Sequence, residues 1–274
     1  MSLAARPQLV LIPAQALNCF LHNSLGFLQA RFLTLHYAWP RALRACGEMV
    51  SGANWPGMNA APSAYTPPEE LANAITHGFG VALSIVGLVL LLVTASRHGD
   101  AWGVSSSAVF GATLILLYSV STLYHSLPGA RRKFLLRKCD HAAIFLLIAG
   151  TYTPVLLVSL RGAWGWSLFG VIWGLAAAGV AMKFWFTGRF GALSMAIYIA
   201  MGWLVVVALR PVLHAVPLGG LLLLLAGGLC YTGGTVFYAW KKLPYHHAVW
   251  HLWVLAGSAC HWAAVYCYIV PTRA

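Results

Sequence analysis

Seven apolar runs follow one another along the chain and constrain its fold more than any other feature. They cover approximately residues 72–95, 103–125, 141–160, 164–183, 191–210, 217–240 and 247–270. Each run has 20 to 24 residues, and about 20 residues of helix cross the ~30 Å hydrocarbon core of a bilayer. Because backbone polar groups in lipid must be satisfied within the protein, the runs predict helices. The predicted fold class is an all-α, seven-transmembrane helix bundle.

The composition agrees with a multi-pass protein of the inner (plasma) membrane. Hydrophobic residues make up 60% of the chain and charged residues 8%, whereas about a quarter of a soluble domain is charged. The net charge of +12 comes from short basic clusters between the apolar runs. There they interact with anionic lipid headgroups and determine the orientation in which the chain is inserted. We therefore expect membrane lipids as partners and no nucleic acid. The six cysteines form no CxxC pair, so no disulfide framework is predicted.

Glycines inside the runs predict close helix packing. They are Gly170 and Gly174 in a GxxxG spacing and the pairs Gly227–Gly228 and Gly233–Gly234. Small residues at such positions let helix backbones approach one another. We expect a compact bundle, and the sequence identifies neither an oligomeric state nor a protein partner.

Lysine and arginine counts in alternate loops predict the orientation. One side carries eleven, at Arg41, Arg44, Arg131, Arg132, Lys133, Arg137, Lys138, Lys183, Arg189, Lys241 and Lys242, and the other carries four, at Arg97, Arg161, Arg210 and Arg273. By the positive-inside rule, the N-terminus is expected in the cytoplasm and the C-terminus outside.

Residues 1–68 are expected to form a poorly ordered extension ahead of a membrane domain over residues 69–274. The apolar stretch at residues 9–17 is too short to span a bilayer. A signal peptide is disfavoured, because seven later spans make its cleavage unnecessary. Two interpretations stay open for the extension: an amphipathic surface arm, and a gene-start error with translation beginning at Met49 or Met58.

The start of the last run carries His247 and His251, four residues apart. On a helix this spacing places both imidazoles on one face, about 6 Å apart along the axis, where they can bind one metal ion. An ionisable residue at this depth indicates a functional site unless it only contacts headgroups and water. That second interpretation weighs more for a single histidine than for the pair.

Other polar residues are expected at the same membrane depth, because four predicted helices have ends on that side. Together with the histidine pair they form the set Glu70, Ser121, His125, Asp140, His247 and His251. Two of the five acids in the chain belong to this set. An ordinary role in a loop would explain one of these polar residues, but it would not explain why all of them lie at the same depth.

These residues form spaced motifs that resemble those of one family. The motifs are Glu70-x2-Asn73-x3-His77, Ser121-x3-His125, Asp140 followed by Gly150-Thr-Tyr-Thr-Pro154, and His247-x3-His251 with His261 ten residues further on. They resemble the bacterial hemolysin III proteins of the progestin and adipoQ receptor (PAQR) family, from about Glu69 to Ile269. The resemblance does not cover the first 68 residues.

The resemblance implies a zinc ion bound by His125, His247 and His251, with Asp140 and Ser121 as the catalytic residues beside it. Three histidines leave the fourth tetrahedral position of zinc for water, as in catalytic sites. In that interpretation Asp140 takes a proton from the water and Ser121 orients the substrate carbonyl or oxyanion. Alkaline ceramidases have a similar pattern, which suggests hydrolysis of a lipid amide such as ceramide.

The remaining polar residues near the site are harder to assign. His261 lies about 15 Å along the helix from His251 and cannot bind the same metal ion. For His261 and His77 a hydrogen bond to a neighbouring helix and a role in a substrate or proton path are equally open. His246 points about 100° away from His247 and is expected to be solvated. Tyr152 and Pro154 are expected to serve a helix kink and its packing.

Three function classes remain. The first is a zinc-dependent hydrolase of a lipid amide or ester that acts in membrane lipid homeostasis. The second is a non-enzymatic sensor or receptor with structural zinc, and the third is a pore that causes cytolysis. A pore is disfavoured because seven spans commit the chain to its own membrane. Haem is disfavoured because it takes one ligand from each face and leaves Asp140 unexplained.

Overall fold

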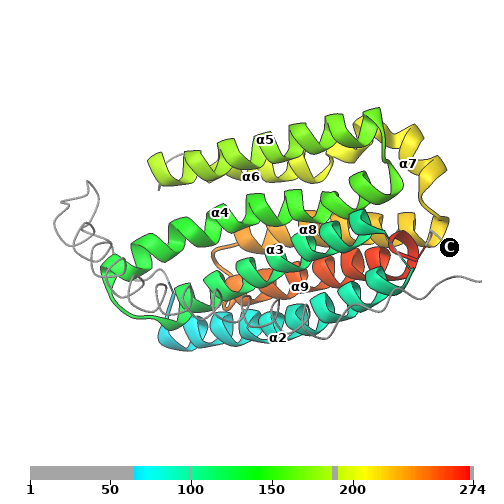
Figure 1. The fold of residues 1–274 in the computed structure, drawn as a ribbon. Coiled ribbons are helices and arrows are strands. Elements are labelled where there is room, and N and C mark those ends of the chain that lie inside the picture. Colours follow the sequence, from blue (N-terminus) through cyan, green and yellow to red (C-terminus); the bar gives the residue numbers. More distant parts are fainter. Residues whose placement is uncertain (1–64, 99, 187–190, 272–274) are drawn as a thin grey trace, which may run out of the picture. The chain divides into compact units, whose positions relative to one another are not determined.

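The computed structural model describes residues 65–98, 100–186 and 191–271, and all of these belong to one compact unit. Seven helical segments of this part are long and apolar enough to cross a membrane (Figure 1). The predicted all-α bundle of seven membrane helices is therefore confirmed. The extension predicted over residues 1–68 lies almost wholly outside the described residues.

The seven segments differ in how regular they are. Four are single helices: α2 (Pro67–His98), α3 (Ala101–Ser126), α5 (Ala163–Trp185) and α8 (Leu218–Ala239). Two end in a π-helical turn, α4 (Ala130–Pro154) in η1 (Val155–Ser159) and α9 (His246–Ala264) in η3 (Val265–Ile269). One is divided into α6 (Gly191–Gly202), the 3-10 turn η2 (Leu204–Ala208) and α7 (Leu209–Ala215).

The divided segment is held by a tyrosine of α4. The hydroxyl of Tyr152 donates a hydrogen bond to the carbonyl oxygen of Gly202 at 2.9 Å and accepts one from the backbone N–H of Val205 at 2.9 Å. Pro211, in the first turn of α7, has no N–H to continue the ladder. Tyr152 thus satisfies backbone groups that the break would leave unpaired in lipid, which agrees with the structural role expected for it.

The basic segment Arg131–Lys138 was expected to be a loop, and this expectation is wrong. It forms the first turns of α4. Long basic side chains can reach polar groups while their backbone stays helical. Lys133 donates to Glu70 at 2.7 Å and Lys138 to the carbonyl oxygen of Phe184 at 3.2 Å. The helix therefore starts before the apolar run, which begins only near residue 141.

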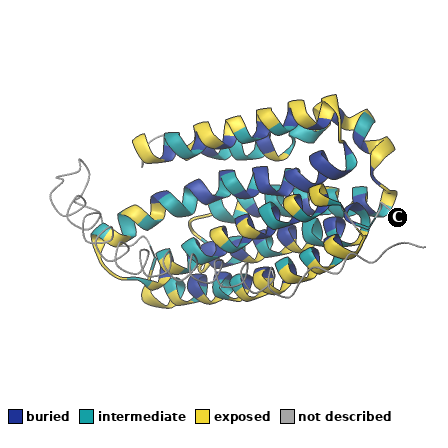
Figure 2. Ribbon diagram, in the orientation of Figure 1, coloured by how far each residue is buried: buried dark blue, intermediate teal, exposed yellow. Residues whose placement is uncertain are grey.

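The packing order brings particular helix ends together. Helix α2 packs against α3 and α9, α3 against α4, α4 against α5, and α8 against α9. In Figure 1 the starts of α2, α4 and α9 and the ends of α3 and α5 lie at one end of the bundle. We call this the site end. Helix α4 is the most enclosed, with 72% of its most apolar window buried against 17% for α8, and Figure 2 shows its dark buried surface.

The glycines divide into two kinds. A Cβ atom at Gly234 would lie 2.7 Å from the side chain of Trp253 and 2.9 Å from that of Trp250, so α8 and α9 meet closely there. At Gly170 and Gly174, by contrast, an added Cβ atom would have no neighbour within 4 Å among the described residues. The GxxxG expectation for this pair is wrong, because the spacing places two glycines on one helix face without saying that another helix covers that face.

Candidate metal centre and cavity

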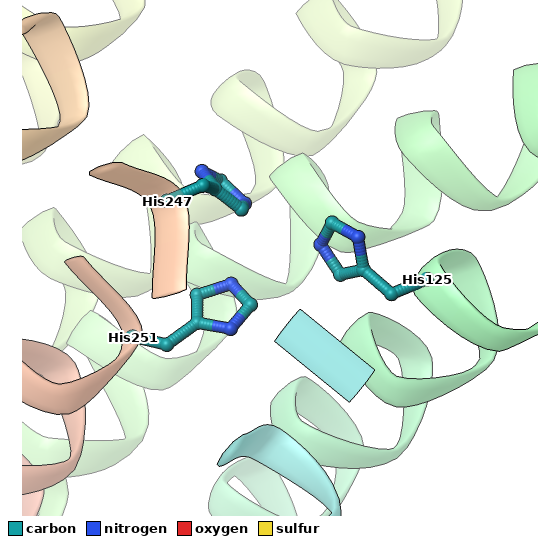
Figure 3. A group of neighbouring side chains, drawn as sticks. All are labelled: His125, His247 and His251. Atoms are coloured by element: carbon teal, nitrogen blue, oxygen red, sulfur yellow. The ribbon is translucent and has the colours of Figure 1, made fainter. Parts of the chain in front are cut away.

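Three histidines converge at the site end of the bundle. His125 lies in the last turn of α3, and His247 and His251 lie in the first turns of α9. All three are buried, and each offers a ring nitrogen that lies within 4.8 Å of the other two. Figure 3 shows the rings facing one another from the two helices. The group has the size and the ligand type for one metal ion.

A carboxylate of α2 fixes the ring of His125. Oε2 of Glu70 lies 2.6 Å from Nδ1 of His125, and Oε1 of Glu70 accepts from Nζ of Lys133 at 2.7 Å. Because the carboxylate accepts, Nδ1 of His125 is the protonated nitrogen. Its Nε2 is buried and has no hydrogen-bond partner among the described residues. A carboxylate that holds one ring nitrogen of a histidine in this way leaves the other nitrogen for a metal.

Backbone and hydroxyl groups of α2 fix His251 in the same way. Nδ1 of His251 lies 3.2 Å from the carbonyl oxygen of Asn73 and 3.1 Å from Oγ1 of Thr76. The Thr76 hydroxyl already donates to backbone carbonyl oxygens at 2.9 Å, so it can accept from the histidine. The backbone carbonyl oxygen of Asn73 can only accept a hydrogen bond. Nδ1 of His251 therefore carries the proton, and the lone pair of its Nε2 is available to a metal.

His77 contributes a fourth imidazole beside the three. Its ring stacks on that of His251, with centroids 3.4 Å apart and planes at 11°, and it meets the edge of Tyr118 at 5.0 Å. Both of its ring nitrogens are buried with no hydrogen-bond partner in the described part of the chain. Of the two roles left open for His77, the hydrogen bond to a neighbouring helix is thus not formed.

Tyr65, just ahead of α2, covers the outer side of the cluster. Its ring stacks on His247 at 4.9 Å and lies 5.8 Å from both His125 and His246. Burial raises the pKa of the Tyr65 hydroxyl above its ordinary value. His246 is only 6% exposed, so the expectation that it is solvated is wrong. The aromatic ring that covers it comes from 181 residues earlier in the chain, and no sequence pattern indicated this contact.

Ser121 and Asp140, the residues predicted beside the metal, line one cavity with His247 and His251. Ser121 is one turn before His125 on α3 and is 1% exposed, and its hydroxyl has no hydrogen-bond partner among the described groups. The Asp140 carboxyl is the hydrogen-bonding neighbour of the Ser121 hydroxyl, although the contact falls outside strict hydrogen-bond geometry. The structure thus brings Ser121 and Asp140 together in the wall of the cavity that His247 and His251 also line.

The cavity has a volume of about 390 Å³ and extends from the histidine cluster into the bundle. Pockets of about 300–1,000 Å³ are typical for small ligands. Apolar side chains such as Leu147, Ile148 and Val254 line it between the cluster and His261, which is about 15 Å further along α9. The cavity is therefore long and mainly apolar, with its chemistry at one end.

His261 has a structural partner. Its Nε2 donates to the carbonyl oxygen of Leu224 on α8 at 3.0 Å, and its ring lies 5.4 Å from that of Tyr231. The hydrogen bond to a neighbouring helix, one of the two roles left open for His261, is formed. His261 is not part of the three-histidine group.

Comparisons with known proteins agree on one family. The family model described as haemolysin-III related matches residues 65–262. This range includes the cluster and both residues beside it. It also begins at Tyr65, the first described residue.

Several curated proteins are similar over most of the same range. The hemolysin-3 homolog of Bacillus subtilis (strain 168) is 47% identical over 209 residues, which cover 76% of this chain and 98% of that protein. Hemolysin-3 of Bacillus cereus is 49% identical over 204 residues, covering 74% and 93%. The human monocyte to macrophage differentiation factor is 30% identical over 217 residues, covering 76% and 86%.

Proposed function

Because the chain belongs to the haemolysin-III related family, we propose that His125, His247 and His251 hold zinc and that the protein hydrolyses an amide or ester bond of a membrane lipid. Its seven spans and its bacterial relatives make it a multi-pass protein of the inner (plasma) membrane. The observation that carries the proposal is the meeting of three histidine nitrogens with Ser121 and Asp140 at the end of an apolar cavity.

The donor set fits zinc. Imidazole nitrogens suit zinc, whereas calcium and magnesium prefer oxygen ligands. Partners on α2 hold Nδ1 of both His125 and His251, so that Nε2 of each ring is left for the ion. Three protein ligands rather than four are typical of catalytic sites, where one position stays open.

Zinc in such a site supplies Lewis-acid chemistry and lowers the pKa of a coordinated water to about 7. The side chains of this chain supply the rest. The carboxylate of Asp140 accepts and returns a proton beside the cluster. The hydroxyl of Ser121 donates a hydrogen bond to the carbonyl oxygen of the bond that is cleaved.

The cavity supports a lipid as the substrate. Its lining between the cluster and His261 is mainly apolar, which suits an acyl chain, and burial of each CH₂ group contributes ~0.8 kcal/mol to binding. The polar groups at the site end would then meet the linkage where the acyl chain ends. A lipid substrate supports a role in membrane lipid homeostasis rather than in the metabolism of soluble compounds.

Metal analysis of the purified full-length protein tests the zinc site. Removal of one ligand leaves two, so His125→Ala, His247→Ala and His251→Ala should each lose most of the zinc. His261→Ala is the matched control, because it removes a histidine that lines the same cavity without belonging to the cluster. Wild-type protein without stoichiometric zinc, or equal loss in the control, would contradict the proposal.

A further inference from the structure

Two basic side chains line the cavity at its site end. Arg137 comes from α4 and Lys183 from the last turn of α5. Their charges act on each other, and both act on His141. With Ser194 of α6, which also lines the cavity, they form what we call the cationic corner: Arg137, Lys183 and Ser194.

Lys183 is turned inward. A lysine near the end of a membrane helix usually extends its ammonium group to the headgroup region. Lys183 is instead 9% exposed, and its Nζ donates to Oγ of Ser194 at 2.5 Å and lies 5.8 Å from the centroid of the Tyr198 ring. A charge withdrawn from water at this depth is costly and marks a functional position.

Three of the four acids in the described residues do not line the cavity. Glu69 accepts from Thr66, Glu70 contacts His125 and Lys133, and Asp100 pairs with Arg161. Asp140 is the one acid among the described residues that line the cavity, and it interacts with Ser121. The charges of Arg137 and Lys183 thus outnumber the carboxylates of the lining by two to one.

We propose that the cationic corner binds the phosphate or carboxylate of an anionic lipid whose acyl chain occupies the apolar part of the cavity. A guanidinium and an ammonium group beside a hydroxyl are suited to anion binding. The apolar lining favours a lipid over a free phosphate ion as the source of the anion. That this lipid is the substrate rests on the proposed hydrolase function, whereas its binding does not.

Native mass spectrometry of the delipidated full-length protein tests this preference. The probes are phosphatidylglycerol and phosphatidylcholine with identical acyl chains. Both carry a phosphate, but the choline cation of phosphatidylcholine cancels its charge, so that phosphatidylglycerol alone of the two has a net negative charge. We expect wild-type protein to retain phosphatidylglycerol at a concentration about tenfold lower than phosphatidylcholine, as is expected for a hydrogen bond to a charged group. Equal retention of the two lipids would overturn the proposal.

Substitutions distinguish lipid binding in the cavity from electrostatic attraction of the lipid at the protein surface. Lys183→Met and Arg137→Gln should each reduce the preference to about twofold or less, while Lys183→Arg should keep most of it. Lys242→Met is the control, because Lys242 is an exposed lysine of the turn between α8 and α9 that does not line the cavity. If Lys242→Met reduces the preference as much as Lys183→Met, the anion is held at the surface and the proposal is wrong.

Two further arms identify the source of the anion and keep the test independent of zinc. Inorganic phosphate at millimolar concentration should compete only weakly with phosphatidylglycerol. If phosphate alone occupies the site and the lipid shows no preference, a lipid ligand is excluded.

In His247→Ala protein, which is expected to lose zinc, adding the Lys183→Met substitution should still reduce the preference for phosphatidylglycerol. If the added substitution has no effect there, the metal and not the cationic corner selects the anion.

Discussion

Oε2 of Glu70 lies 2.6 Å from Nδ1 of His125, while Oε1 of the same carboxylate lies 2.7 Å from Nζ of Lys133. One side chain of α2 thus joins the end of α3 to the start of α4. It fixes both the tautomer and the direction of the His125 ring. The orientation of the proposed zinc ligand therefore depends on a residue that does not touch the ion.

Glu70→Ala should weaken zinc binding without abolishing it. Loss of such an outer-shell partner typically reduces metal affinity about 10- to 100-fold. Competition with a chromophoric zinc chelator measures the change. Glu69→Ala is the matched control, because the Glu69 carboxylate bonds Thr66 and the backbone of Tyr245 and not the cluster. Equal affinity of Glu70→Ala and wild type would show that Glu70 does not support the metal.

Tyr65→Ala should speed the loss of zinc to a chelator by about two- to tenfold, since an aromatic pair contributes about 0.5–1.5 kcal/mol. The reason is that the ring stacks on His247 at 4.9 Å and covers the cluster. Tyr65→Phe keeps the ring and should release zinc at the wild-type rate. If Tyr65→Phe and Tyr65→Ala behave alike, the hydroxyl and not the stacked ring protects the site.

Gly234→Val should lower the thermal unfolding temperature in detergent, because its side chain would meet Trp250 and Trp253 across the interface of α8 and α9. Overpacking of this kind costs about 1–3 kcal/mol. Gly170→Val, whose added Cβ atom has no neighbour within 4 Å in the described part of the chain, should unfold at the wild-type temperature. The reverse order would mean that α5, at Gly170, packs against a surface which the described bundle does not contain.

The site end is expected to face the cytoplasm, because the loops predicted from the sequence assign eleven basic residues to that side of the membrane and four to the other. Alkaline phosphatase, which is active only outside the cytoplasm, should be active when fused after Arg273. It should be silent when fused at Gly129, between α3 and α4. The opposite pattern would place the proposed zinc site at the outer face.

The membrane spans were predictable because length and hydropathy suffice for a helix in lipid. The details that depend on neighbouring helices were not. The spacing of Gly170 and Gly174 could not show that their face is uncovered. The division of the fifth span depends on the Tyr152 hydroxyl, which lies on another helix.

The convergence of His125, His247 and His251 followed from the ends of antiparallel helices, since alternate ends share one side of the membrane. The positions of the helix ends do not predict which individual side chains are in contact. Neither the stacking of His77 on His251 nor the cover of His246 by Tyr65 has a signal in the spacing of residues. Both depend on how α2, and the residue ahead of it, are placed against α9.

Zinc content and lipid hydrolysis, measured on the same samples of wild type and Asp140→Asn, test the central proposal most directly. The substrate is a set of vesicles of total bacterial lipid supplemented with ceramide, and released fatty acid is quantified by mass spectrometry. We expect wild type to release fatty acid, and Asp140→Asn to keep stoichiometric zinc while its rate falls about 10²–10⁴-fold, because an amide cannot accept the proton. Zinc-loaded wild type that releases no fatty acid, or Asp140→Asn that matches its rate, would contradict the hydrolase and favour a sensor with structural zinc.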